Sequence, residues 1–125
     1  MTSVTITLDL PDSRLHAHAK GGWRAKRPAV KSARGLAHMI AIRDRGAFRR
    51  PDRATIHYAF FVPDNRQRDE ANLIQMCKPY VDGLCDAGLI VGDHWQVLST
   101  GGVSVEIDRD RPRVELTITE RDDDA

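Results

Sequence analysis

The sequence predicts a single α+β domain in which two helices pack on a mixed β-sheet. First, apolar residues alternate with a period of two in some segments and recur at helical spacing in others, in the order β-α-β-α-β-β. Second, this order has too few strand–helix–strand crossovers for a doubly wound parallel sheet. Third, 125 residues suffice for one core but not for two. We therefore interpret residues 1–125 as one domain, with residues 121–125 as a frayed tail.

The first half of the chain contains a strand, a helix and a second strand. Residues 4–10 (VTITLDL) alternate and are followed by Pro11, which predicts a strand and then a basic loop. Ser32 is a suitable N-cap, and small or apolar residues recur at helical spacing from there to Gly46, which predicts the first helix. Residues 54–63 (ATIHYAFFVP) are rich in β-branched and aromatic side chains, which predicts the central strand.

The second helix is predicted over residues 70–87, with Asp69 as its N-cap and Gly88 as its stop. Pro79 inside this range predicts a kink or a break near Lys78. Strands over residues 96–107 and 113–120 complete the sheet. At about 100° per residue, one helix face carries the residues expected in the core: Leu73, Met76, Cys77, Tyr80, Leu84 and Ala87.

Charge is divided unevenly along the chain, although the net charge is only +1. Residues 14–53 contain twelve basic and two acidic residues, whereas the rest contains seven basic and sixteen acidic residues. A basic segment with an aromatic residue suits a phosphate backbone, although a solvated charged surface also explains it. The residues predicted to contact DNA are Lys20, Trp23, Arg24, Lys26, Arg27, Lys31 and Arg34.

The sequence also predicts the compartment. No run approaches about 18 apolar residues, and the N-terminus alternates like a strand instead of resembling a signal peptide, so we expect a cytoplasmic protein without a membrane segment. Cys77 and Cys85 do not fit a C-x-x-C motif and are expected to be reduced residues of the core. The isolated pair His16 and His18 is more typical of a polar surface or a DNA contact than of a metal site.

An ordered set of motifs surrounds the second helix: VPDNRQRDEAN, KPYVD and DAGLIVGD. Together with SVTITLDLP at the start of the chain and RVELTITE near its end, this set resembles the RusA family of Holliday junction resolvases. The resemblance is to the family pattern as a whole. It implies a magnesium-dependent endodeoxyribonuclease that acts as a homodimer on four-way DNA junctions in recombination and repair, with Mn²⁺ as a substitute cation. The matching residues are Arg68, Asp69, Asn72, Lys78, Asp82 and Asp93.

The resemblance assigns a role to each matching residue. Asp69 and Asp93 are expected to bind Mg²⁺, which prefers oxygen ligands and supplies a nucleophilic water to phosphodiester hydrolysis. Lys78 is expected to stabilise the charge of the transition state. Arg68 and Asn72 would orient a ligand or the backbone, and Asp82 would pair with Lys78 at the i, i+4 spacing.

Two departures from the family pattern keep alternatives open. Ala71 stands where the best-known members have a second Asp, and the adjacent Glu70 is a candidate substitute, although on a helix it points about 100° away. The segment between Asn72 and Lys78 is also three residues longer than in the short form of the family. The alternative is a DNA-binding module of the same fold with weakened or lost catalysis, and an RNA-directed protein is a third interpretation.

The reach of the chain limits how Asp69 and Asp93 can meet. A straight helix over residues 70–87 would be about 27 Å long, whereas the six residues 88–93 span at most about 20 Å. Either a break at Pro79 folds the helix back, or a dimer builds each site from Asp69 of one subunit and Asp93 of the other. We favour the shared site as a hypothesis.

Overall fold

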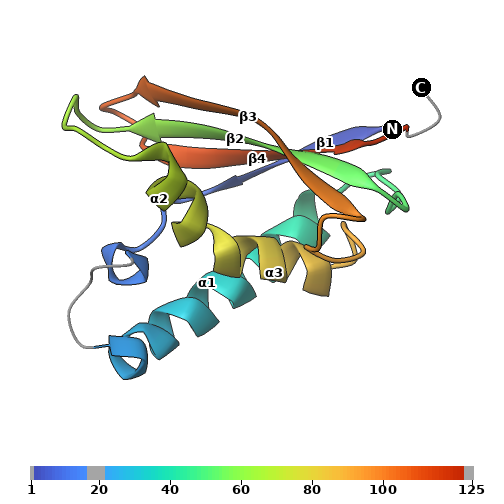
Figure 1. The fold of residues 1–125 in the computed structure, drawn as a ribbon, viewed down its shortest axis with the longest axis horizontal. Helices are drawn as coiled ribbons and strands as arrows, with labels where there is room; N and C mark the ends of the chain where they lie inside the picture. The colour runs from blue at the N-terminus through green and yellow to red at the C-terminus, as the bar shows by residue number, and fades with distance from the viewer. Residues whose placement is uncertain (1, 17–21, 123–125) are drawn as a thin grey trace.

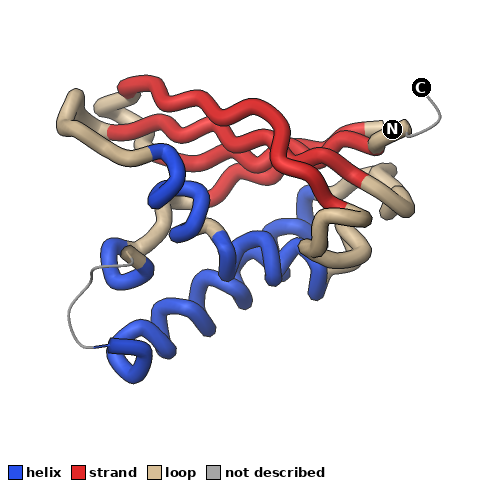
Figure 2. Tube along the Cα trace, in the orientation of Figure 1, coloured by secondary structure: helices blue, strands red, loops and turns tan. Residues whose placement is uncertain are grey.

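The computed structural model describes residues 2–16 and 22–122 and has the predicted α+β architecture (Figure 1). The helices lie on one face of the sheet, and among the described residues no helix covers the other face (Figure 2). The elements are β1 (Ser3–Leu8), a 3₁₀ turn (Ser13–Leu15), α1 (Gly22–Asp44), β2 (Ala54–Val62), α2 (Glu70–Met76), α3 (Lys78–Asp86), β3 (Leu98–Ile107) and β4 (Arg113–Glu120).

The sheet is mixed, as predicted, with the strand order β1-β4-β2-β3. β4 is antiparallel to both β1 and β2, whereas β2 and β3 are parallel. β2 is therefore an interior strand. A parallel pair needs a long crossover connection, and α2 and α3 provide it between β2 and β3. This crossover contains all six residues that match the RusA motifs.

The core forms between the inward face of the sheet and the helices. Alternate residues of β1 and β4, such as Ile6, Leu116 and Ile118, are fully buried, as expected for strands with one covered face. Phe60 of β2 and Leu84 of α3 fill the space between the layers. All but one of the residues predicted on the core face of the second helix are buried, and Leu73 is half-buried.

α1 begins at Gly22, ten residues before the predicted N-cap Ser32, so the predicted start of this helix is wrong. Ala29, Ala33, Ala37 and Ala41 are its buried residues and recur every fourth position. These small side chains allow α1 to pack closely, and the charged residues between them face outward. Pro28 is tolerated because it is exposed, so the carbonyl group left without an N–H donor can bind water.

The predicted break of the second helix is confirmed. α2 ends at Met76 and α3 begins at Lys78, with Cys77 between them. Pro79 lies in the first turn of α3, where a helix does not need the missing N–H group. Gly88 follows the C-cap Ala87 of α3 and has a φ of 78°, a conformation that favours glycine, so it ends the helix as predicted.

The structure also bears on the predictions for the cysteines, the C-terminal tail and membrane-spanning helices. Cys77 and Cys85 are both free, with Cys77 buried and Cys85 half-buried. The backbone N–H of Arg121 donates to the carbonyl of Arg53, so the C-terminal segment is attached to the sheet at least to this residue. Residues 123–125 lie outside the described residues. Among the described helices, none combines the length and the apolar character required to cross a membrane.

Candidate active site

The N-terminus of α2 presents Asp69 as predicted. Asp69 has extended backbone angles, and its carboxylate accepts a hydrogen bond from the backbone N–H of Ala71 at 3.0 Å. This is the usual geometry of an N-cap, and it fixes the side chain at the first turn of the helix. One carboxylate oxygen is used in this bond, and the other remains available for a ligand.

Arg68 organises the loop that precedes the helix. Its guanidinium donates to the carbonyl oxygens of Asp64 and Arg66 at 3.0 and 3.1 Å, and it forms an ion pair of 2.9 Å with the carboxylate of Asp64. The Arg68 side chain is largely buried by these contacts. The prediction that Arg68 orients the backbone agrees with this arrangement.

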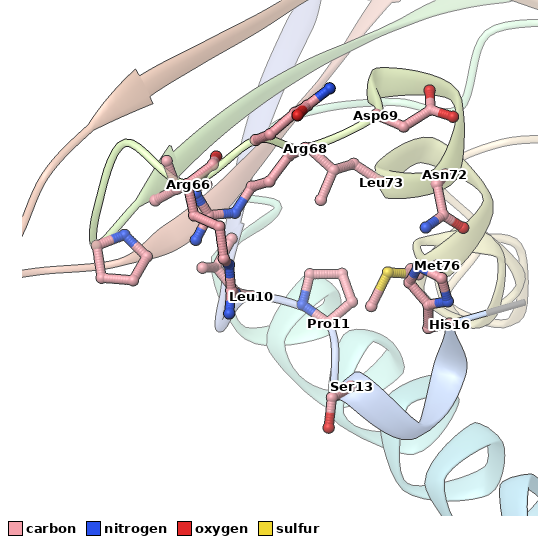
Figure 3. Close-up of a pocket in the computed structure, with 13 residues that line it drawn as sticks. Leu10, Pro11, Ser13, His16, Arg66, Arg68, Asp69, Asn72, Leu73 and Met76 are labelled. Carbon is pink, nitrogen blue, oxygen red and sulfur yellow. Dashed lines mark hydrogen bonds between the residues drawn. The ribbon is translucent and has the colours of Figure 1, made fainter. Parts of the chain in front are cut away.

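Asp69 and Asn72 line a cavity of about 990 Å³ between α2, the end of β2 and the segment after β1 (Figure 3). Apolar side chains such as Leu10, Leu73 and Met76 line part of it, and polar groups line the rest. The polar lining residues are Ser13, His16, Arg66, Gln67, Arg68, Asp69 and Asn72. A half-apolar cavity with a few polar groups is typical of ligand sites.

Arg66 is a residue of this cavity that the sequence analysis did not single out. Its backbone N–H donates to Asp64, but within the described residues its guanidinium makes no ion pair with a carboxylate. An exposed guanidinium without an acidic partner is suited to a phosphate group. The signal in the sequence was the alternation of Arg66 and Arg68 directly before the helix.

Lys78, Asp82 and Asp93 form a second cluster at the start of α3. The ammonium group of Lys78 donates to the Asp82 carboxylate at 2.6 Å, which confirms the predicted i, i+4 pair, and it also donates to the carboxylate of Asp93. The sequence did not predict this second contact, because Asp93 lies in the loop after α3. Lys78 thus connects that loop to the helix.

Hydrogen bonding sets the charges of this cluster. The hydrogen bond from Lys78 lowers the pKa of the Asp93 carboxyl group, so Asp93 is ionised at neutral pH. Partial burial lowers the pKa of Lys78, but the hydrogen bonds to Asp82 and Asp93 outweigh this effect and raise it. Two carboxylates therefore face one ammonium ion.

Asp69 and Asp93 line different cavities of the chain. Asp69 lines the large cavity, whereas Asp93 and Lys78 line a separate cavity of about 300 Å³ near β2 and β3. The two cavities share no lining residue. Among the described residues, no group of three or more His, Cys, Asp or Glu side chains is arranged to hold a metal ion.

The two carboxylates that the resemblance assigns to Mg²⁺ therefore line separate cavities of one chain. The break at Cys77 exists, but it does not place Asp69 and Asp93 in one cavity. Glu70, which was considered as a substitute for the second Asp, does not line either cavity. His16 of the predicted H-x-H pair lines the large cavity, and His18 lies outside the described residues.

The basic residues predicted to contact DNA lie mostly on the first half of α1. The Arg27 guanidinium lies over the Trp23 ring, 5.6 Å from its centroid. Arg34 forms an ion pair of 2.6 Å with Asp86 and thereby connects α1 to α3. Arg24 and Lys31 are exposed, Lys26 is half-buried, and Lys20 lies outside the described residues.

Comparison with known proteins adds little about function. No protein-family model matches the sequence. An uncharacterized protein of Xylella fastidiosa (strain Temecula1 / ATCC 700964) is 33% identical over 86 residues. The aligned region covers 66% of this chain and 56% of that protein, so the chain matches little more than half the length of this relative.

Proposed function

We propose that this protein is a structure-specific endodeoxyribonuclease that cuts four-way DNA junctions as a homodimer, similar to the RusA family. The observation that carries the proposal is the position of Asp69 and Asn72. Both match the resemblance, both belong to the first turn of α2, and both line the large cavity beside Arg66 and Arg68 (Figure 3). A cavity lined by a carboxylate, an amide and two guanidinium groups suits a phosphodiester substrate.

Each residue of the cavity has a role in this proposal. The free guanidinium of Arg66 would bind a DNA phosphate. Arg68 would hold the loop in place through its bonds to Asp64 and to the Arg66 carbonyl. The Asn72 side chain would orient the phosphate or a water molecule, and the carboxylate oxygen of Asp69 that is not bonded to Ala71 would accept a proton or bind a cation.

The proposal includes a Mg²⁺ ion only as a ligand that two subunits bind together. Because Asp69 and Asp93 line different cavities of one chain, we place the Mg²⁺ site between Asp69 of one subunit and Asp93 of the partner subunit. When bound, such a cation supplies charge neutralisation at the phosphate and an activated water. Lys78 would remain next to Asp93, where its ammonium group can contact the same phosphate.

A DNA-binding module without nuclease activity is the second candidate function. Ala71 replaces one carboxylate of the family pattern, and Lys78 already neutralises Asp93. Both observations reduce the capacity of a single chain to bind a cation. This candidate predicts tight binding of four-way junctions without cleavage.

Incubation with a labelled four-way junction in Mg²⁺ distinguishes the two candidates. We expect paired nicks in the junction and no cuts in a linear duplex or in RNA of the same sequence. Asp93→Asn should abolish cleavage while the affinity for the junction stays equal or rises, because the change removes a negative charge near DNA. Binding without any cleavage would support the module, and an Asp93→Asn protein that still cuts would refute the role of Asp93.

A further inference from the structure

Trp95 has the highest exposed fraction among the large hydrophobic side chains of the described residues, at 80%. It belongs to the loop between α3 and β3, two residues after Asp93. Within the described residues, neither a ring contact nor a cation–π contact engages its indole, whereas Trp23 has Arg27 over its ring. Tryptophan is enriched at binding interfaces, because its indole combines a large apolar ring with a polar N–H group.

The loop that carries Trp95 is fixed by hydrogen bonds. The backbone N–H groups of Val97 and Leu98 both donate to the carbonyl of His94 at 3.0 Å, so Trp95 lies inside a closed turn. The N–H of Ala54 donates to Val97 at 2.9 Å. These bonds fasten the turn to the first residue of β2, and the indole is therefore presented by a defined backbone.

Arginines lie on the segments that bond to this turn. Residues 49–53 (RRPDR), which lead into β2, contain three arginines and one aspartate. Arg49 and Arg50 are exposed and precede Ala54, whose N–H bonds to the turn, by five and four residues. The guanidinium of Arg121 donates to the carbonyl of Gln96 on the other side. The described acidic residues closest in sequence to these arginines are Asp52, Glu120 and Asp122, and Asp93, two residues before Trp95, is paired with Lys78.

An exposed indole on a turn whose adjoining segments carry arginines is complementary to single-stranded nucleic acid. Base–aromatic stacking needs only the face of a base, and the arginines neutralise the phosphates on either side. An apolar protein partner would instead require a larger uncharged surface around the ring. The charge of the flanking residues thus favours nucleic acid over a second protein.

We propose that Trp95, Arg49 and Arg50 form a nucleic-acid contact in which the indole stacks on an exposed base face. Such faces occur in single strands, and also where strands exchange in branched DNA, because the flanking base pairs lose a stacking neighbour there. The inference takes its class of partner from the proposed function, but it does not depend on cleavage. It places a DNA contact in the loop after α3, outside residues 20–34, where the sequence predicted DNA contacts.

Tryptophan fluorescence gives a direct test. The chain has two tryptophans, so Trp23→Phe leaves Trp95 as the sole reporter. We expect a single-stranded oligonucleotide and a four-way junction to quench this emission, and a blunt duplex to quench it much less. Unchanged emission at DNA concentrations that saturate binding would overturn the inference.

Variants separate stacking from a structural role. Trp95→Ala should weaken binding of the oligonucleotide by about five- to a hundredfold, the usual effect of one lost stacked base, whereas Trp95→Phe should retain most of the affinity. Changing Arg49 and Arg50 together to Gln should lower the salt slope by up to about two units. Met39→Ala, at another exposed apolar residue, is the matched control and should bind like the wild type.

The outcomes also distinguish this inference from the proposed nuclease. If the wild type cuts junctions and Trp95→Ala binds and cuts equally well, the inference fails and the function stands. If Trp95→Ala loses single-strand binding in a protein that never cuts, the function fails and the inference stands. If Trp95→Ala instead abolishes self-association and leaves DNA binding unchanged, the indole is a subunit contact and the inference is wrong.

Discussion

Gly83 of α3 lies at the closest approach between α3 and α1. A Cβ atom at this position would lie 2.4 Å from the carbonyl oxygen of Arg34, 2.8 Å from the Cβ of Ala37 and 3.0 Å from the backbone nitrogen of His38. Two of these atoms belong to the α1 backbone, and the Cβ of Ala37 is bonded directly to it. They therefore cannot move away without shifting the whole helix. We therefore predict that Gly83→Ala forces α1 and α3 apart.

The size of the effect follows from two opposing contributions. Overpacking of a well-packed contact costs about 1–3 kcal/mol, and three contacts at or below 3.0 Å favour the upper end. Replacing glycine by alanine inside a helix contributes about 1 kcal/mol in the opposite direction. The free energy of unfolding of Gly83→Ala should therefore fall by about 2 kcal/mol.

Gly35→Ala is the matched control in the neighbouring helix. A Cβ atom at Gly35 would meet no atom within 4 Å, so only the helix propensity changes and the protein should gain about 0.5–1 kcal/mol. Urea unfolding followed by circular dichroism measures both variants, with an unchanged m-value as the criterion for comparison. If Gly83→Ala is as stable as the wild type, or more stable like Gly35→Ala, α1 and α3 do not approach each other closely at Gly83 and the reasoning is refuted.

Two further predictions concern charges on α1. Asp86→Asn should lower the urea midpoint at pH 7, because it removes the ion pair with Arg34. The Arg34 hydrogen bond holds the pKa of Asp86 below its usual value, so this stabilisation is present above about pH 4 and is lost as the pH falls further; the difference between variant and wild type should then disappear. Changing Lys26, Arg27 and Lys31 together to Ala should weaken DNA binding and lower the salt slope by up to about three units, and an unchanged slope would place DNA elsewhere.

The sequence predicts the strands and the helix break well, because their causes are local. Alternation over residues 4–10 and 113–120 sets one covered face, and Pro79 cannot continue a helix in its interior. The start of α1 was missed because alanines every fourth position carry little apolar signal among charged residues. Their role depends on how closely α3 approaches, as Gly83 shows, and this is a tertiary property.

The candidate site was predictable only where its contacts join residues that are close in the sequence. The cap by Asp69 and the pair of Lys78 with Asp82 are local and follow from spacing along a helix. The contact of Lys78 with Asp93 depends on the return of the loop after α3, and the position of Arg66 at the cavity depends on how the end of β2 meets the segment after β1. Neither is encoded in a short motif.

The central claim is that Asp69 and Asp93 complete one site only across two subunits. Mixing Asp69→Asn protein with Asp93→Asn protein tests it most directly, once subunit exchange has been verified by labelled subunits. Each variant alone should leave a four-way junction intact. In the mixture, a heterodimer regains one site with both carboxylates, and we predict that it nicks the junction in Mg²⁺ without making the second cut. If exchange occurs and no nick appears while the wild type cuts both strands, the two carboxylates act within one chain and the shared site is refuted.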